Sequence, residues 1–447
     1  MINRHRRVAL HTLGCKLNYS ETSSIAEDFR KRGYEIVDLG EPTDIIVINT
    51  CTVTEQADTE CRKIIRRGLK AAPDARVVVT GCYAQLKPEE IASFDGVTAV
   101  VGTAGKSHIA AHAELYLEAT APIVDVQDLD DDTSFVGSST AEGDSRSRAF
   151  LKLQDGCDYS CSFCTIPLAR GPARAMAFPD VIPAIRDLSQ QGYTEVVLSG
   201  INLGEYDAPT GERFVDVVRT VASEALPLRV RVSSIEPNTL TTAIIDIIAS
   251  SPVFAKHLHI PLQSGSSEIL RKMRRRYQPE HYREIVEYVR HTMSDAGIGI
   301  DVIVGFPGET DELFEESYRF LESVPWSYLH VFTYSERVNT PAAAYPGRVP
   351  VDVRRARTAR LRALSDRRRS QHAASFVGNN VVIVPESYDA ATGRWVGWSS
   401  EYVRVHMSGP ELLVRGAHVA QVVSPLQDHP TEVLAAWQGL SAPSHTT

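Results

Sequence analysis

The chain has 447 residues, enough for about three domains with well-filled cores. Its hydrophobic content of 43% and charged content of 23% are typical of a soluble protein, and no apolar run reaches the ~18 residues of a membrane helix. A net charge of −9 excludes a globally basic nucleic-acid binder, so any surface for a polyanion must be local. With seven cysteines and no signal-peptide core after its basic start, the chain is expected in the reducing cytoplasm.

The first part of the chain, residues 1–123, alternates apolar strands with helices. We expect strands at 7–15, 44–49, 75–79 and 97–101, and helices at 18–33 and 56–71. This alternation predicts an α/β domain with an open parallel sheet and helices on both faces.

Three cysteines of this domain share one position in the predicted topology. Cys15, Cys51 and Cys82 each follow the carboxyl end of a strand, so we expect them to meet at one sheet edge as a three-thiolate site. Unrelated buried cysteines are the alternative. Cys61 lies about two turns into a helix, and we interpret it as a structural thiol, with replacement of one of the three ligands as the alternative.

The rest of the chain divides by composition. Residues 124–147 are acidic and then small and polar, which predicts a mobile interdomain linker. Strands expected at 148–154, 195–198, 229–232, 257–260, 299–304 and 329–334, with helices between them, predict a partial (β/α) barrel over 148–372 that ends in a basic helix. Short strands expected at 380–384, 395–398, 403–406, 412–415 and 418–423 predict a small β-barrel over 373–437, before a tail at 438–447.

The loop after the first barrel strand carries Cys157, Cys161 and Cys164 in a Cys-x3-Cys-x2-Cys spacing. Three thiolates do not make a closed disulfide set and are one short of a tetrahedral zinc site. A [4Fe–4S] cluster with three protein ligands, and one iron open to an outside ligand, fits better. The alternatives are a zinc loop whose fourth ligand lies elsewhere and three buried thiols.

Loops after the later barrel strands are candidates to line a cofactor pocket on the same face. The candidate residues are Phe163, Ser199, Gly200, Asn202, Ser233, Glu236, Gln263 and Gly305. An ordinary strand-to-helix turn is the alternative for each loop. Phe163 is a candidate to pack on a purine ring, with core packing as its alternative. His257, His259 and His330 are interpreted as core or pocket-lining residues rather than metal ligands.

Two local basic runs are candidates for contact with phosphates, with solvated charged faces as the alternative. The candidate residues are Arg271, Lys272, Arg274 and Arg275 in the first run, and Arg354, Arg355, Arg367, Arg368 and Arg369 in the second. The segment 373–447 is acidic by comparison, so we expect the basic runs to contribute more of any phosphate contact than the small β-barrel.

The cluster loop from Cys157 to Cys164 resembles that of the radical S-adenosylmethionine enzymes. Taken with His11–Asn18, Asn49–Cys51, Thr80–Cys82 and a final β-barrel similar to a TRAM domain, it resembles the methylthiotransferases, a subfamily with two [4Fe–4S] clusters. The segments Leu13–Asn18, Leu153–Cys157 and His330–Phe332 look most like the MtaB type, whose members methylthiolate C2 of N6-threonylcarbamoyladenosine at position 37 of tRNA.

The resemblance implies that the cluster of Cys157, Cys161 and Cys164 binds S-adenosylmethionine and, once reduced, cleaves it to a carbon radical, while the cluster of Cys15, Cys51 and Cys82 carries the sulfur. The implied partners are the anticodon loop of tRNA, a reductant such as flavodoxin or ferredoxin, and a sulfur donor, with no membrane. The alternatives are a methylthiotransferase acting on isopentenyl-adenosine in tRNA or on an aspartate of a ribosomal protein, and a non-catalytic iron–sulfur RNA-binding redox sensor.

Overall fold

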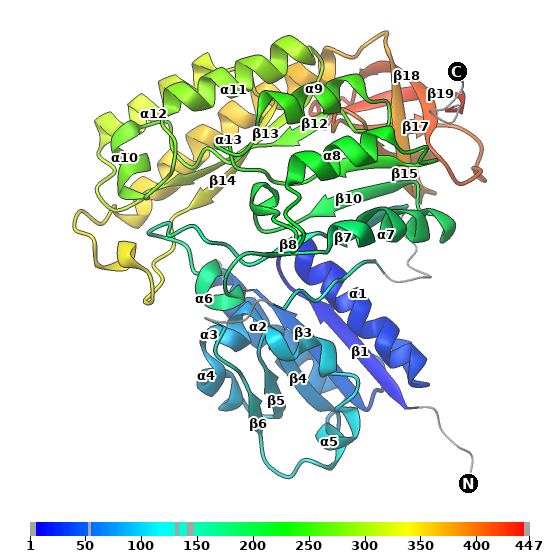
Figure 1. Cartoon of the computed structure of the whole chain (residues 1–447), viewed down its shortest axis with the longest axis vertical. Coiled ribbons are helices and arrows are strands. Elements are labelled where there is room, and N and C mark those ends of the chain that lie inside the picture. The colour runs from blue at the N-terminus through cyan, green and yellow to red at the C-terminus, as the bar shows by residue number, and fades with distance from the viewer. Residues whose placement is uncertain (1–5, 52–54, 130–133, 141–146, 442–447) are drawn as a thin grey trace. The chain divides into compact units, whose positions relative to one another are not determined.

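The computed structural model describes residues 6–51, 55–129, 134–140 and 147–441 (Figure 1). The chain forms two compact units. Unit 1 comprises Met1–Asp144, Phe150–Ser160 and Cys164–Met176, and unit 2 comprises Ser145–Ala149, Cys161–Phe163 and Ala177–Thr447. None of the helices in the described ranges is both long and apolar enough to span a bilayer.

Unit 1 is built on a parallel sheet of six strands in the order β2-β1-β3-β4-β5-β6 (Figure 1). The strands are β1 (Arg7–Thr12), β2 (Glu35–Val37), β3 (Ile45–Thr50), β4 (Arg76–Gly81), β5 (Val97–Val101) and β6 (Ile123–Asp125). Every residue of β3 and β5 is buried, because helices cover both faces of the sheet. The predicted open parallel sheet is confirmed, and β2 and β6 extend it beyond the four predicted strands.

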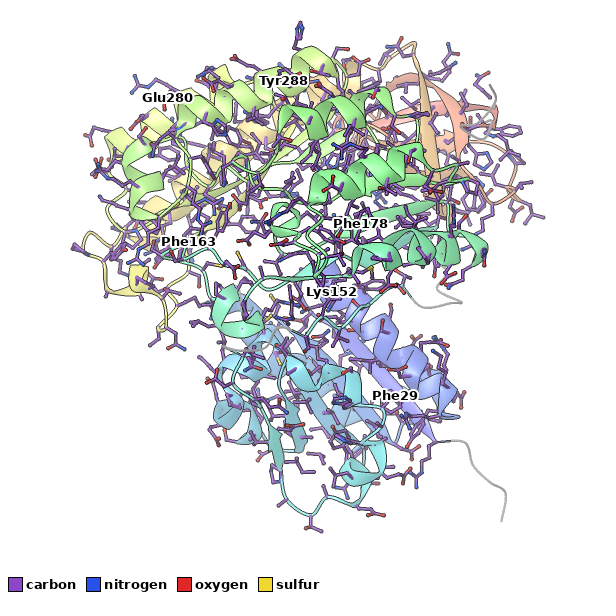
Figure 2. All side chains as sticks on the ribbon, viewed as in Figure 1. Phe29, Lys152, Phe163, Phe178, Glu280 and Tyr288 are labelled. Carbon is purple, nitrogen blue, oxygen red and sulfur yellow. The ribbon has the colours of Figure 1, made fainter. Side chains whose placement is uncertain are left out.

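Helices of unit 1 pack on both faces of this sheet. On one face, α1 (Lys16–Lys31) and α5 (Ala113–Glu118) complete a hydrophobic cluster that includes the fully buried Phe29 (Figure 2). On the other face lie α2 (Glu55–Ala71), α3 (Cys82–Leu86) and α4 (Pro88–Ala92). Cys61 is fully buried in the cluster on that second face, which agrees with its interpretation as a structural thiol.

Part of the expected linker is held by hydrogen bonds within unit 1. Ser138 Oγ lies 2.9 Å from Ser20 Oγ, and its carbonyl accepts a hydrogen bond of 2.9 Å from the amide of Lys152. The hydroxyl of Thr140 accepts a hydrogen bond of 2.8 Å from the amide of Phe150. Residues 138–140 are therefore anchored, in contrast to the mobility expected for the linker, while 130–133 and 141–146 lie outside the described residues.

The strands of the predicted partial barrel form two parallel sheets, in the orders β11-β10-β7 and β12-β13-β14. The strands are β7 (Arg148–Lys152, whose first two residues belong to unit 2), β10 (Glu195–Ser199), β11 (Arg229–Val232), β12 (His257–His259), β13 (Gly297–Val304) and β14 (Tyr328–Thr333). A bridge between Ser234 and His259 links the two sheets. The helices are α7 (Phe178–Gln190), α8 (Phe214–Ser223), α9 (Thr242–Ser250), α10 (Ser267–Lys272), α11 (Pro279–Thr292), α12 (Asp311–Ser323) and α13 (Val351–Ala374).

The C-terminal part of unit 2 is a closed β-barrel in the order β15-β16-β17-β19-β18. Its strands are β15 (Asn380–Asp389), β16 (Arg394–Ser399), β17 (Arg404–Ser408), β18 (His418–Pro425) and β19 (Glu432–Leu440). The strand predicted at 412–415 is wrong, because Leu412 and Val414 are 90% and 68% exposed and face no core. The strand that closes the barrel is β19, whose central Ala435 and Ala436 lack the β-branched signal of a typical strand.

The small β-barrel docks on the amino ends of the larger barrel's strands. Glu195, the first residue of β10, is fully buried and forms ion pairs with Arg229 and Arg231, the latter at 2.9 Å. Arg231 in turn donates a hydrogen bond of 2.9 Å to the carbonyl of Ser399 in β16. Burial alone would raise the pKa of Glu195, but these arginines hold it well below its usual range. The carboxyl ends of the strands therefore remain available for a cofactor.

Candidate functional site

The three N-terminal cysteines lie at the carboxyl edge of the parallel sheet in unit 1. Cys51 directly follows β3, Cys82 directly follows β4, and Cys15 caps the start of α1 three residues after β1. These three strands are neighbours, and the last residue of β3, Thr50, pairs with Gly81 at the end of β4. The structure therefore places the three cysteines as the sequence predicted, on adjacent strand ends.

Asn18 and Gly14 fix the loop that carries Cys15. The Asn18 amide donates hydrogen bonds of 2.8 Å to the Leu13 carbonyl and 2.9 Å to the Thr50 carbonyl, which joins this loop to the end of β3. Gly14 has a φ of +99°, and a Cβ there would lie 3.0 Å from the Cys51 Sγ atom. Only glycine allows this approach of the Cys15 loop to Cys51 without strain.

The buried Cys82 thiol has cations near it. Burial raises the pKa of Cys82, while the charges of Arg170 and Lys106 act in the opposite direction. The Cys15 thiol raises the pKa of Cys82 further. Metal binding requires the thiolate form, so the nearby cations favour this edge as a metal site.

The second cysteine group is held by backbone hydrogen bonds typical of a loop that surrounds a metal centre. The amide of Tyr159 donates to the Cys157 Sγ atom at 3.4 Å, and the amide of Ile166 donates to the Cys164 Sγ atom at 3.4 Å. Both bonds lie within unit 1. Such N–H···S bonds stabilise negative charge on sulfur and thereby tune the reduction potential of an iron–sulfur cluster.

The side chain of Arg275 is buried beside Cys161 in unit 2. Its side chain is 3% exposed, and its Nη1 atom donates a hydrogen bond of 3.2 Å to the Cys161 Sγ atom. It also forms an ion pair with Glu236, one of the candidate cofactor residues. Burial raises the pKa of Cys161 and Arg275 lowers it, so the arginine favours the thiolate. The sequence placed Arg275 among the candidates for phosphate contact, a role that its burial disfavours.

The donors at both sites fit [4Fe–4S] clusters. Cys15, Cys51 and Cys82 offer three free thiols on adjacent strand ends. A cubane binds thiolates at separate corners, so donors on separate strand ends suit it. In addition, each group has three cysteines, one fewer than the four protein ligands of a fully coordinated [4Fe–4S] cluster.

The candidate cofactor residues occupy the expected carboxyl ends of strands in unit 2. Ser199 ends β10, Ser233 follows β11, Gln263 follows β12 and Gly305 follows β13, with Gly200, Asn202 and Glu236 beside them. Ser233 is buried, and its hydroxyl has no hydrogen-bond partner among the described residues. Phe163 is half-buried and packs edge-on against Phe306, at 6.5 Å between ring centroids, so core packing accounts for part of its role (Figure 2).

The candidates for phosphate contact separate by exposure. Arg271, Arg274, Arg355 and Arg367 are exposed, while Arg368 and Arg369 are partly exposed. Lys272 is partly exposed and pairs with Glu268 at 2.7 Å. Arg354 is only 3% exposed and pairs with Glu336 at 2.6 Å, so its charge is used inside unit 2.

A cluster of three polar side chains lies on the neighbouring strands β12, β13 and β14 of unit 2. The ligand atoms of His259, Asp301 and His330 all lie within 4.8 Å of one another. The two ring nitrogens of His259 already have hydrogen-bond partners, Ser234 Oγ at 2.7 Å and Asp301 Oδ1 at 3.0 Å. These partners agree with the interpretation of His259 as pocket-lining. His257 is buried and stacks on the ring of Tyr402 at 4.3 Å, as expected for a core residue.

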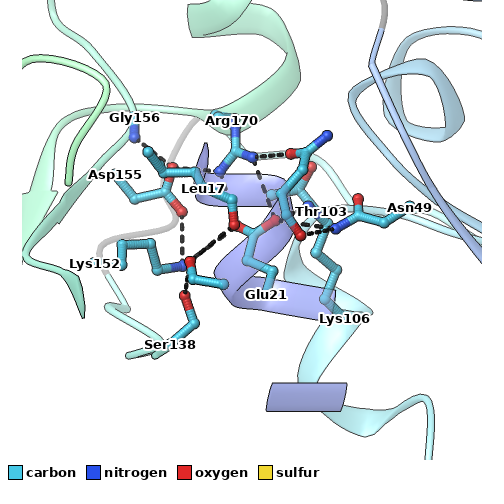
Figure 3. Close-up of polar contacts among 12 residues, drawn as sticks. Leu17, Glu21, Asn49, Thr103, Lys106, Ser138, Lys152, Asp155, Gly156 and Arg170 are labelled. Atoms are coloured by element: carbon cyan, nitrogen blue, oxygen red, sulfur yellow. Dashed lines mark hydrogen bonds and ion pairs between the residues drawn. The ribbon is translucent and has the colours of Figure 1, made fainter. Parts of the chain in front are cut away.

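Sequence reasoning missed a buried ionic network in unit 1 (Figure 3). Its members are Glu21, Lys106, Lys152, Asp155, Arg170 and Arg174, each no more than 9% exposed. Arg170 ends α6 (Ile166–Arg170) six residues after Cys164, and Asp155 lies two residues before Cys157. This proximity in sequence to the cluster loop was the available signal, but nothing in the sequence connects these residues with Glu21.

Two family models match the chain. The model of the Radical SAM superfamily matches residues 151–321, and the model described as uncharacterized protein family UPF0004 matches residues 7–102. Among solved structures, the radical S-adenosylmethionine methyltransferase TsrM from Kitasatospora setae has a TM-score of 0.56 at 16% identity, covering 76% of this chain and 74% of that one. At this identity the likeness concerns the fold.

Curated relatives match nearly the whole chain. The threonylcarbamoyladenosine tRNA methylthiotransferase MtaB of Bacillus subtilis is 38% identical over 412 residues, which cover 91% of each chain. The protein of the same name from Aquifex aeolicus is 36% identical and covers 82% of this chain and 89% of its own. The tRNA-2-methylthio-N(6)-dimethylallyladenosine synthase of Thermobifida fusca is 34% identical, over 86% of this chain and 78% of its own.

Proposed function

Because the chain belongs to the radical S-adenosylmethionine tRNA methylthiotransferase family, we propose that it inserts a methylthio group at C2 of N6-threonylcarbamoyladenosine at position 37 of tRNA. The Bacillus and Aquifex relatives carry this base in their names, at higher identity than the Thermobifida dimethylallyladenosine synthase. One structural observation supports the chemistry most. Three cysteines meet at one sheet edge in the same compact unit as Cys157 and Cys164.

The two cysteine groups would hold different clusters. Cys157, Cys161 and Cys164 would hold a [4Fe–4S] cluster that binds S-adenosylmethionine, and Cys15, Cys51 and Cys82 would hold a second. When bound, these groups supply a carbon radical, the sulfur and the methyl group. The protein holds the thiolates in place, orients the substrate and limits access of water.

The face of β14 that carries His330 and Phe332 offers a surface for the substrate base. His330 pairs with Asp301 in the register of β14 and β13, and Phe332 lies two residues further along β14 on the same face. His330 is exposed and Phe332 is 43% exposed, although both belong to a strand whose first residues are buried. An exposed aromatic ring beside polar groups suits a modified adenine, which stacks on one and hydrogen-bonds to the others.

The remaining partners follow from the same reaction. The anticodon loop of tRNA would contact the exposed cations Arg271, Arg274, Arg355 and Arg367. A reductant such as flavodoxin or ferredoxin and a sulfur donor would complete the cycle, in the cytoplasm. The buried Arg275 and Arg354 are left out of this tRNA surface.

Mass spectrometry of tRNA nucleosides tests the substrate. Cells lacking the gene should lose the methylthio form of N6-threonylcarbamoyladenosine, and expression of the wild-type chain should restore it. Persistence of that nucleoside in a strain with no second enzyme would refute the assignment. Loss of methylthio-dimethylallyladenosine instead would assign the second candidate substrate, which the Thermobifida relative carries in its name.

Iron content and S-adenosylmethionine cleavage test the two clusters. Cys157→Ala should retain about half of the iron and lose cleavage, because this cluster binds S-adenosylmethionine. Cys51→Ala should also retain about half of the iron and keep cleavage, but stop sulfur insertion. Cys61→Ala is the matched control, since this thiol is buried in the core. Cleavage by the Cys157 variant would contradict the assignment.

A further inference from the structure

The buried ionic network of unit 1 contains more positive than negative charge. Among the described residues it has four cations, Lys106, Lys152, Arg170 and Arg174, and two carboxylates, Glu21 and Asp155. The excess is therefore two positive charges inside the protein. Buried charge is costly unless a counter-charge lies close by. Helix α3, which begins at Cys82, packs against helix α6, which ends at Arg170, so thiolates at this edge would supply the missing negative charge.

Arg170 lies at the centre of this network and is fully buried (Figure 3). Its Nη1 atom donates hydrogen bonds of 2.9 Å to Glu21 and 2.8 Å to Asp155, and its Nη2 atom donates one of 2.7 Å to the Asn18 Oδ1 atom. The buried Nε atom has no hydrogen-bond partner among the described residues. A guanidinium donor without an acceptor inside a protein is expensive, so this N–H is expected to meet an acceptor in the loaded enzyme.

Two hydrogen-bonded routes lead from Arg170 to the cysteine loops. In one direction, Asn18 connects it to the carbonyls of Leu13 and Thr50, which lie two residues before Cys15 and one residue before Cys51. In the other, Asp155 accepts from the amide of Gly156, the residue before Cys157. All of these residues belong to unit 1. One side chain thus joins the loops of both cysteine groups.

We propose that Arg170 is a positioning residue shared by both cluster sites, and that its Nε–H donates a hydrogen bond to sulfur of the cluster held by Cys15, Cys51 and Cys82. The inference rests on the proposed two-cluster function. A cation and a donor beside a cluster stabilise its reduced form, because reduction adds negative charge. Arg170 therefore makes this cluster easier to reduce and holds it in register with the loop of Cys157.

The test isolates the N-terminal cluster in a Cys157→Ala, Cys161→Ala, Cys164→Ala background. In this parent, potentiometric titration followed by electron paramagnetic resonance measures the reduction of a single cluster. Arg170→Gln should make the reduction equilibrium at least tenfold less favourable, a fall of about 59 mV for one electron. Arg170→Lys keeps the charge but lacks the Nε donor, so its potential should fall less, with an altered resonance spectrum.

Arg30→Gln is the matched control, since it removes one positive charge from an exposed site on α1 of the same unit. Its cluster should titrate as in the parent. Equal potentials in the parent and Arg170→Gln would overturn the inference. If Arg170→Gln does not load iron, Arg170→Lys decides, and a potential and spectrum identical to the parent overturn the inference. A parent that binds no cluster would instead overturn the proposed two-cluster function, and this inference with it.

Discussion

The exposed arginines of the first basic run, Arg271 and Arg274, offer the most direct test of how this protein binds tRNA. The run contains four candidate cations, but the structure leaves only Arg271 and Arg274 exposed. Lys272 pairs with Glu268, and the Arg275 side chain, at 3% exposure, bonds to Cys161 and Glu236. We therefore predict that the double variant Arg271→Gln, Arg274→Gln weakens tRNA binding through two lost phosphate contacts.

The magnitude follows from counterion release. Each phosphate contact contributes about 0.7 to the slope of log K against log salt on a single strand and about 0.9 on a helix. Losing two contacts should flatten the slope by about 1.4 to 1.8. When the salt concentration rises from about 50 to 200 mM, the binding constants of both proteins decrease. The fold-decrease should be about 7 to 12 times smaller for the double variant than for the wild type. The variant's deficit is thus greatest at low salt.

A filter-binding or anisotropy series with an anticodon stem-loop measures this slope. The matched control is Arg219→Gln, which removes an exposed arginine of α8 that pairs with Asp216. The control should keep the wild-type slope. If the double variant also keeps it, Arg271 and Arg274 do not contact phosphates, and the tRNA surface must lie elsewhere.

Three further predictions concern Phe332 on β14, the ion pairs of Glu195 and the buried His372. Phe332→Ala should raise the KM for the tRNA substrate by about 5- to 150-fold while leaving iron content unchanged, because stacking of a base on an aromatic ring contributes about 1–3 kcal/mol; an unchanged KM would exclude the stacking. Glu195→Gln should lower the free energy of unfolding by about 3–5 kcal/mol at pH 7, since it leaves Arg229 and Arg231 buried without their carboxylate; denaturant titration measures this, and a loss below 1 kcal/mol (about the value of an exposed pair) would contradict it. Burial lowers the pKa of His372 from 6.5 to about 4. The unfolded chain therefore binds a proton at this histidine at a higher pH than the folded chain does. About 3 kcal/mol of stability that is present above pH 6.5 should be lost as the pH falls to 4. His372→Gln should remove that part of the pH dependence. Denaturant titrations across this pH range measure the free energy of unfolding of both proteins. The same pH dependence in the two proteins would refute the prediction.

Much of the fold was predictable because local patterns and tertiary structure agree. Strand β3 is buried on both faces, and a strand of this kind has a continuous apolar sequence. That local pattern alone indicates a parallel strand. The predicted strand at 412–415 failed because a short apolar run alone does not show whether a core lies opposite it. In β19, Ala435 lies in the core of the closed barrel, and no local propensity marks such an alanine-containing strand.

The positions of the six cysteines were predictable for a similar reason, since each follows a strand end or stands in a tight motif. Their surroundings were not. Arg275 belongs to a run of cations in sequence, yet it bonds to Cys161, because a left-handed residue, Arg274 with a φ of +57°, precedes it and redirects the chain. Glu21 reads as one polar residue of an amphipathic helix, although it is a partner of Arg170.

The two cysteine groups thus share a feature that their spacing alone does not reveal. A buried arginine accompanies each group: Arg275 is bonded to Cys161, and Arg170 ends helix α6, which packs against the helix that begins at Cys82. Each arginine also forms an ion pair with a carboxylate. A cationic neighbour favours thiolates and cluster reduction, while the carboxylate fixes its position and limits its net effect. Replacing the carboxylate rather than the arginine should therefore shift a cluster's potential in the opposite direction. Such a pair of variants separates the electrostatic role of each arginine from its contribution to packing.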